Sequence, residues 1–91
     1  MQTQHVRYFL AVCDELNFTR AAKKCGVSQP SLTNAVKRLE REVGGALFVR
    51  STRPPHVELT ALARKLHPTY VQLDALLAEL RGTNRKGTVF D

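Results

Sequence analysis

The connection between two helical patterns, at residues 18–25 and 28–43, most restricts the fold of this 91-residue sequence. Gly26 ends the first pattern, because glycine takes the left-handed conformation at a helix C-terminus without a steric penalty. Ser28 can then accept a free N–H of the next helix through its side-chain oxygen, and Pro30 lies in the first turn, where its missing N–H costs nothing. Two helices joined by a Gly-containing turn of about three to four residues indicate a helix-turn-helix. An ordinary helical hairpin is the alternative at this point.

The segments around this turn also follow helical spacing. Apolar residues at positions 6, 9, 10, 13 and 16 predict a helix over residues 4–16. Asn17 is placed to cap the short helix at 18–25. Ala21 and Ala22 are small, so another helix can approach this one closely. The helix at 28–43 turns an apolar face inward that consists of Leu32, Ala35, Val36, Leu39 and Val43.

A β-hairpin is predicted for the next segment, which reads ALFVRSTRPPHVELT at 46–60. Residues 46–50 and 56–59 are short extended stretches, and the two prolines between them exclude a helix and favour a turn. A hairpin that directly follows a helix-turn-helix is a wing. The predicted fold class is therefore mostly α, a winged helix-turn-helix of three helices and a two-stranded wing, followed by a long linker or dimerisation helix.

The long helix is predicted from Thr60 to Arg81. Its apolar positions follow the 3-4 spacing of a heptad seam with one polar member, namely Leu59, Leu62, Leu66, Thr69, Leu73, Leu76 and Leu80. Such a helix is about 33 Å long, and we expect its seam to need a partner, most simply a second copy of the chain. Pro68 removes one backbone hydrogen bond and can kink the helix. The residues predicted to form the dimer are Leu62, Leu66, Leu73, Leu76, Leu77 and Leu80.

The sequence divides into three parts on this interpretation. Residues 1–58 form the winged helix-turn-helix, 59–81 the linker and dimerisation helix, and 82–91 a glycine-containing, basic linker stub. We expect a fragment of a longer chain rather than a naturally short protein.

Charge points to the first of these parts as the site of a polyanionic partner. The chain carries a net charge of +6 with a pI of about 9.9. Residues 1–57 hold nine Lys and Arg against four acids, which gives +5, whereas residues 58–91 hold five against four, which gives +1. Such a basic balance is typical of nucleic-acid binding, although it does not establish it.

Other classes of protein find little support in the sequence. No apolar run approaches the roughly 20 residues of a membrane span, and no signal peptide is expected. Cys13 and Cys25 do not make a disulfide framework and are predicted to be buried, reduced thiols, which fits a cytosolic location. His5, His56 and His67 lack ligand spacing, and no nucleophile motif or phosphate loop occurs. We therefore expect no metal, no cofactor and no enzymatic activity.

The polar face of the helix at 28–43 is rich in hydrogen-bonding side chains and suits the major groove of DNA. Gln and Asn can pair with adenine, Thr can contact thymine, and Lys or Arg can reach guanine or phosphate; bases are read mainly from the N-terminal part of such a helix. A merely solvated face is the alternative. The start of the helix at 18–25 can bind a phosphate, although Asn17 can also act only as a cap. The candidate DNA-binding residues are Asn17, Thr19, Arg20, Ser28, Gln29, Pro30, Ser31, Thr33, Asn34, Lys37, Arg38, Arg50 and Arg53.

Two of these candidates lie in the wing. Arg53 at its tip is expected to enter a narrow A·T-rich minor groove or to contact an adjacent phosphate. Arg50, at the end of the first extended stretch, is expected to clamp a phosphate rather than to read a base.

Several motifs resemble one family. NFTRAA, VSQPSLT, KRLE, G..LF.R and the Leu-Thr pair at 59–60 are similar to the N-terminal DNA-binding domain of LysR-type transcriptional regulators, over residues 4 to about 80. The resemblance implies a linker helix that pairs antiparallel across a two-fold axis, full-length tetramers, and a larger C-terminal domain, absent here, that senses a small-molecule effector. It also implies an interrupted palindrome with T and A at its ends as the target, contacted by Gln29, Pro30, Ser31, Thr33 and Asn34, with Arg53 in the wing.

This sequence departs from the family pattern at four positions. Thr33 stands where Ser is usual, Asn34 where Arg is frequent, and Ala63 where Gly is usual. Pro68 is also unusual in a linker helix. The first two changes should alter base preference, and the last two bear on the geometry of the dimer.

Two functions remain to be compared. The first is sequence-specific binding of double-stranded DNA by a homodimer, whose recognition helices occupy successive major grooves about 34 Å apart. The second is a winged-helix module for protein contact and dimerisation without specific DNA readout, in which the polar face would only be solvated.

Overall fold

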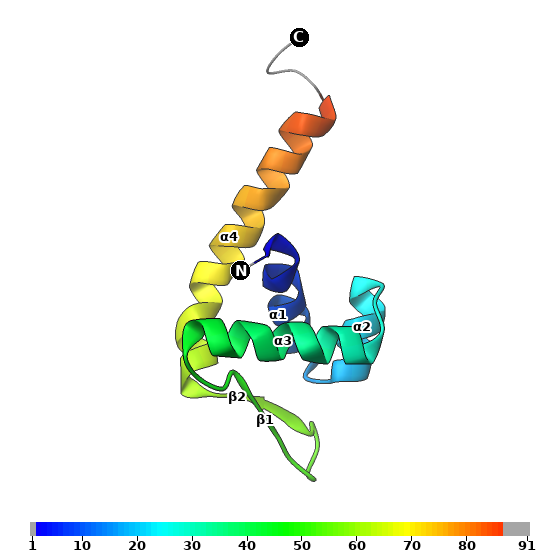
Figure 1. Cartoon of the computed structure of the whole chain (residues 1–91), viewed down its shortest axis with the longest axis vertical. Coiled ribbons are helices and arrows are strands. Elements are labelled where there is room, and N and C mark those ends of the chain that lie inside the picture. The colour runs from blue at the N-terminus through cyan, green and yellow to red at the C-terminus, as the bar shows by residue number, and fades with distance from the viewer. Residues whose placement is uncertain (1, 87–91) are drawn as a thin grey trace.

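The computed structural model describes the backbone of residues 2–86 and the side chains of residues 2–81. Figure 1 shows α3 crossing the body of the molecule, α1 and α2 packed behind it, the wing at one end and α4 projecting from the other. This arrangement confirms the predicted fold class, a mostly α winged helix-turn-helix with a long final helix. The elements in chain order are α1 (Thr3–Glu15), α2 (Phe18–Cys25), α3 (Gln29–Val43), β1 (Phe48–Arg50), β2 (Val57–Leu59) and α4 (Ala61–Lys86).

The caps that were predicted around the helix-turn-helix are all present. The Asn17 side chain accepts a hydrogen bond from the Arg20 backbone N–H at 2.8 Å. Gly26 ends α2 in the left-handed region with φ 71°. The Ser28 hydroxyl accepts the backbone N–H of Ser31 at 3.2 Å. Each cap satisfies a helix-end group that has no partner within its own helix, so these local contacts fix the angle at which α3 leaves α2.

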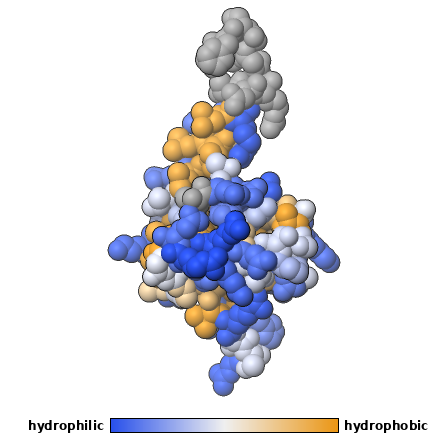
Figure 2. Space-filling model, in the orientation of Figure 1, coloured by the Kyte–Doolittle hydropathy of each residue, from blue (hydrophilic) through white to orange (hydrophobic). Residues whose placement is uncertain are grey.

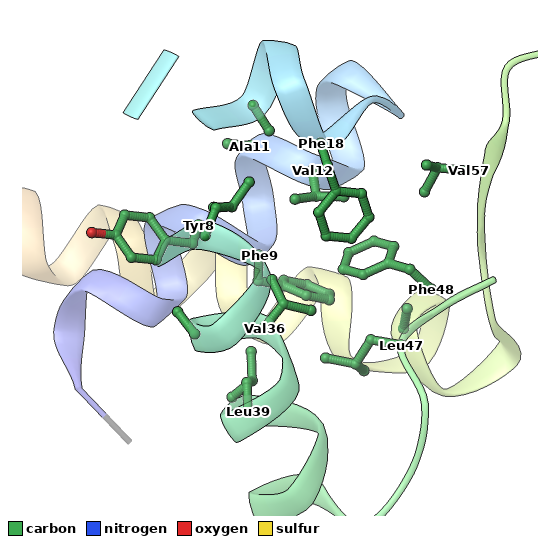
Figure 3. Packing of buried hydrophobic residues seen from close by; sticks show 14 of the residues in the cluster. Tyr8, Phe9, Ala11, Val12, Phe18, Val36, Leu39, Leu47, Phe48 and Val57 are labelled. Carbon is green, nitrogen blue, oxygen red and sulfur yellow. The ribbon is translucent and has the colours of Figure 1, made fainter. Parts of the chain in front are cut away.

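One aromatic cluster joins the helices to the wing (Figure 3). The Phe9 ring of α1 lies 5.7 Å from the Phe48 ring of β1 and 4.8 Å from the Tyr70 ring of α4, between centroids. The Phe18 ring meets Phe48 edge-on, with centroids 5.9 Å apart. Phe9 is completely buried. The core therefore holds α1, α2, β1 and α4 in one unit, and α3 completes it through its buried Leu32, Ala35, Val36 and Leu39.

The wing is tied to α3 by a carboxylate. One oxygen of Glu40 accepts the backbone N–H of Leu47 at 2.7 Å and that of Phe48 at 3.5 Å. β1 then pairs antiparallel with β2, so that Arg50 lies opposite Val57. The two strands are shorter than the stretches predicted from sequence. Just before β1, the Leu47 N–H donates to Glu40, while the Leu47 carbonyl accepts the Thr60 N–H at 3.0 Å.

Thr60 and Gly45 bring the start of α4 against the loop that precedes the wing. The Thr60 hydroxyl donates to the backbone carbonyl of Ala46 at 2.7 Å and accepts the N–H of Ala63 at 3.2 Å. It thus caps α4 and anchors it in one contact. A Cβ at Gly45 would lie 2.9 Å from a terminal methyl carbon of Leu62, so the absence of a side chain there permits this approach.

α4 differs from the prediction in two respects. It runs without a break through Pro68 and continues to Lys86, beyond the expected end at Arg81, while residues 87–91 lie outside the described part. Its leucine seam is also divided. Its members Leu59, Leu62, Leu66 and Leu73, together with the neighbouring Leu77, are partly buried against the chain's own core. That the seam needs a partner stays a prediction.

The distal members of the seam remain uncovered. Leu76 is 56% exposed and Leu80 61% exposed. Figure 2 shows the corresponding hydrophobic patch on the projecting part of α4. Leu80 follows Leu62 by about five full helical turns, so both leucines point in the same direction around the helix axis. The distal leucines are uncovered because this part of α4 projects beyond the rest of the domain (Figure 1).

Both cysteines are free and partly buried, rather than fully buried as predicted. Burial raises the pKa of the Cys13 thiol to about 12 and also raises the pKa of Cys25. The thiols therefore stay protonated near neutral pH, which makes them poor nucleophiles. Within residues 2–86, none of the helices combines the length and the apolar composition needed to span a membrane.

Replacing Glu40 should loosen the junction between α3 and the wing. Glu40→Ala leaves the Leu47 N–H without its acceptor, and we expect a loss of about 1–3 kcal/mol in the free energy of unfolding. Glu40→Gln keeps an acceptor oxygen and should lose less. Urea denaturation measures both, with Glu58→Ala on the exposed side of β2 as the control. Equal stability of Glu40→Ala and the control would contradict this role.

Candidate nucleic-acid interface

The exposed face of α3 is polar and cationic over its whole length. Figure 2 shows hydrophilic residues covering the side of α3 that is turned toward the viewer. Thr33 is half-buried, which differs from its predicted position on the open face. The other predicted residues at the start of and along α3 are exposed, namely Ser28, Gln29, Pro30, Ser31, Asn34, Lys37, Arg38 and Arg41.

A hydrogen bond from α2 orients the first side chain of α3. The Thr19 hydroxyl donates to the Oε1 atom of Gln29 at 3.3 Å. Because the carbonyl oxygen and the NH₂ group of an amide point in opposite directions, the Gln29 nitrogen is turned away from Thr19 and remains available as a donor.

Ser28 and Ser31 are similarly linked. The Ser28 hydroxyl donates to the Ser31 hydroxyl oxygen at 2.9 Å while it accepts the Ser31 backbone N–H. Ser28 is thus fully engaged as a cap, whereas the proton of the Ser31 hydroxyl is left for an external acceptor.

Arg50 is held close to the start of α2. Its guanidinium carbon lies 4.4 Å from the centre of the Phe18 ring, an attractive contact between a cation and an aromatic face. Arg50 also lines a shallow depression together with Thr33 and Lys37 of α3. The sequence predicted Arg50 to be a phosphate clamp, and the structure brings it beside α3.

A pocket of about 290 Å³ opens between α2, α3 and the wing. The start of α2 contributes Asn17 and Thr19, while Arg50 and His56 come from the wing. Asn17 is already used as a cap, and Arg20 is exposed on the same turn. The pocket is lined by Asn17, Phe18, Thr19, Gln29, Arg50, Ser51, His56 and Val57.

The wing tip is a closed turn that projects Arg53. The Arg53 backbone N–H donates to the Ser51 hydroxyl at 3.1 Å, and the His56 N–H donates to the Arg53 carbonyl at 2.7 Å. The Arg53 side chain is exposed. Figure 1 shows the tip extending away from the helices.

The cations of this surface are available to an external anion. Among residues 2–81, no ion pair joins a carboxylate to Lys37, Arg41, Arg50 or Arg53. Arg38 lies near Glu42, whose pKa it helps to lower. Lys24 lies 3.3 Å from the nearest carboxylate oxygen of Asp14. Lys24 is therefore neutralised within the protein, whereas Lys37, Arg41, Arg50 and Arg53 are not.

Two histidines have environments that sequence reasoning missed. His5 is 4% exposed, and its Nδ1 atom lies 3.9 Å from a carboxylate oxygen of Glu42 and has no hydrogen-bond partner among residues 2–81. Burial lowers the pKa of His5, so its neutral form is favoured. His5 lies at helical spacing from the buried Val12 and Phe9, which could have signalled its burial. His56 enters the pocket only through the folding of the wing.

No cluster of metal ligands was found in the part of the chain that the structure describes. The pocket residues include no carboxylate and no thiol, so their chemistry is that of hydrogen-bond donors and cations.

Known proteins are similar to this chain in sequence and in fold. Residues 3–64 match the family described as bacterial regulatory helix-turn-helix protein, lysR family. The HTH-type transcriptional regulator BudR of Klebsiella aerogenes is 45% identical over 89 residues, which cover 93% of this chain and 61% of BudR. The chain thus spans less than two thirds of that relative.

Two solved structures have the same arrangement of elements. The CbnR DBD in its complex with DNA is 31% identical with a TM-score of 0.82, covering 96% of this chain and 98% of that one. The BenM DBD in complex with catB site 1 DNA is also 31% identical, with a TM-score of 0.81, covering 94% and 90%.

LysR-family regulators are a non-enzymatic family, which agrees with the predicted absence of catalytic activity. The similarity covers the winged helix-turn-helix and the long helix that follows it. This chain belongs to the lysR family of bacterial regulatory helix-turn-helix proteins and corresponds to the DNA-binding domain of a LysR-type transcriptional regulator.

Proposed function

We propose that this domain binds double-stranded DNA in a sequence-specific manner as a homodimer, with α3 in the major groove and the wing at the minor groove. The observation that carries the proposal is the exposed face of α3, on which the cations Lys37 and Arg41 have no carboxylate partner within the described residues. A face that was only solvated would not need these groups beside a wing that carries two further arginines. The alternative of a protein-contact module leaves this face without a use.

Base readout is assigned to the N-terminal part of α3. The Gln29 amide nitrogen is directed outward by Thr19, so Gln29 is a donor to the acceptors that adenine, guanine and thymine present in the major groove. Asn34 lies on the same exposed face and can pair with adenine. Ser31 and the half-buried Thr33 have shorter side chains and would contact the DNA more closely. Pro30 belongs to the same turn of α3.

Phosphate contacts flank this readout. Arg20 and Thr19 at the start of α2 face one stretch of backbone together with Arg50, and Lys37 and Arg38 extend along α3. Each neutralised phosphate releases counterions, so affinity should fall steeply with salt. Arg53 at the wing tip is suited to a narrow minor groove, where the negative potential is enhanced.

Dimerisation is assigned to the exposed distal part of α4. Leu76 and Leu80 form an apolar stripe that the domain itself does not cover, and a second copy is the partner whose chemistry matches it. Leu73 and Leu77 lie partly buried beside this stripe and would border the contact, whereas Leu62 and Leu66 lie nearer the start of α4. Two antiparallel copies would place both α3 helices in successive major grooves.

The wider organisation of the protein follows from the family. We propose a winged helix-turn-helix at 1–58, a linker and dimerisation helix from 59 to about 81, and a connection at 82–91 to an effector-binding domain. In the full-length protein this would give a tetramer regulated by a small molecule, acting in the bacterial cytoplasm at the nucleoid.

Selection from a random duplex pool at near-physiological salt tests specific recognition. We expect an enriched inverted repeat. The variants Gln29→Ala and Asn34→Ala should each weaken binding to it by about 1–3 kcal/mol and leave binding to a scrambled duplex nearly unchanged. Gln72→Ala, exposed on α4, is the matched control. If no repeat is enriched and both duplexes bind equally, the proposal is wrong.

The double variant Leu76→Glu with Leu80→Glu tests the dimer interface. Like charges on both copies should give a monomer in sedimentation, and affinity for the inverted repeat should fall by about 10²-fold or more through lost bivalency. Val71→Glu is the control, since Val71 is also exposed, at 46%, but lies on another side of α4. A double variant that remains dimeric would place the interface elsewhere.

A further inference from the structure

We propose that His56 binds a phosphate of the DNA backbone in the pocket between α2 and the wing, and that its protonation strengthens this contact. The proposal rests on the proposed DNA-binding function. It adds a DNA-contacting residue that lies outside the α3 face and is distinct from Arg53 at the wing tip. It also makes DNA affinity depend on pH.

The composition of the pocket suits an anion. Arg50 contributes a guanidinium, Thr19 a hydroxyl and His56 an imidazole. The acid of the wing, Glu58, does not line the pocket. Arg50 cannot swing freely, because its guanidinium is stacked on Phe18 at 4.4 Å. The pocket therefore has a fixed cation on one wall, and a volume of about 290 Å³ that can admit a phosphate group.

The imidazole of His56 is oriented by its own turn. Its Nδ1 atom lies 3.3 Å from the backbone carbonyl oxygen of Ser51. A carbonyl only accepts, so Nδ1 must carry the hydrogen in this contact. In the neutral ring Nε2 is then an acceptor, which cannot bond to a phosphate oxygen. Only the doubly protonated ring offers Nε2 as a donor, and it brings a positive charge as well.

This chemistry couples proton binding to DNA binding. Imidazole is the side chain whose charge changes between about pH 5 and 8. If phosphate binds the protonated ring more tightly, then by linkage affinity must rise as pH falls through that range. Among the described residues, Arg50 is the charged side chain that shares the pocket with His56, and its charge does not change over this range.

The variant His56→Asn isolates this contribution. His56 has a positive φ of 76°, and Asn is one of the residues that tolerates this conformation, so the turn should be retained. Asn also keeps an N–H group near the Ser51 carbonyl but has no titratable group. His67→Asn on α4 is the matched control, because His67 lines none of the pockets described among residues 2–81.

Binding should be measured by fluorescence anisotropy at about pH 6 and about pH 8, at constant ionic strength. We expect His56→Asn to bind about three- to tenfold more weakly than the unaltered protein at the lower pH, and equally at the higher pH. At the lower pH its salt slope should also be smaller by up to about one. His5 is present in every variant, so its own titration cancels in each ratio.

The test compares the dissociation constant of His56→Asn with that of the unaltered protein, as a ratio at each pH. The same ratio at both pH values would overturn the proposal, whether the ratio equals one or shows an equal loss of affinity at both. The ratio should be measured on the selected inverted repeat and on a scrambled duplex, since a phosphate contact acts on both. Equal binding of the unaltered protein to the two duplexes would refute sequence-specific function, but the pH dependence of the ratio would still decide the role of His56.

Discussion

The packing of Phe48 against Phe18 and Phe9 is the contact on which the interface depends. Through this cluster β1 is fixed to the start of α2, at centroid distances of 5.9 and 5.7 Å. Arg50 follows Phe48 by two residues in the same strand, and its guanidinium carbon lies 4.4 Å from the centre of the Phe18 ring. The hydrophobic core and the placement of a cation that we propose to contact DNA are thus one arrangement. Loss of the aromatic contact would release the wing and its pocket together.

α4 connects this core to the proposed dimer. Its proximal part is held by Tyr70, which lies 4.8 Å from Phe9 between ring centroids, and by the completely buried Ala63. The family usually has Gly at that position, and the methyl group is accommodated here within the core. Pro68 is on an exposed side of the helix, where water can satisfy the carbonyl that its missing N–H leaves free. Because α4 is packed on its own domain, the orientation of a partner on the distal stripe would set the orientation of both α3 helices.

Much of the fold could be predicted because its signals are local. The caps at Asn17, Gly26 and Ser28 depend on residues within a few positions of each other, and they were predicted correctly. The division of the leucine seam could not be predicted, because Leu73 and Leu76 have the same spacing whether they face the chain's own core or another copy. For the same reason the sequence did not reveal the half-burial of Thr33 or the place of His56, both of which depend on tertiary packing. The burial of His5 was missed although its helical spacing from Phe9 and Val12 signals it.

The hydrogen bond from Thr19 to Gln29 joins the two halves of the proposed recognition surface. Thr19 belongs to the start of α2, for which we propose a phosphate contact, and its hydrogen bond sets which end of the Gln29 amide is turned outward. A contact between α2 and the DNA backbone that moves α2 would therefore change base readout without any new contact to a base. The departures from the family pattern fit this division of roles. Asn34 lacks the charge of the frequent Arg and is left to hydrogen bonding, while positive charge is supplied by Arg38, one turn further along the same exposed face. Specificity in this domain then rests on oriented amides, and affinity on cations placed around them.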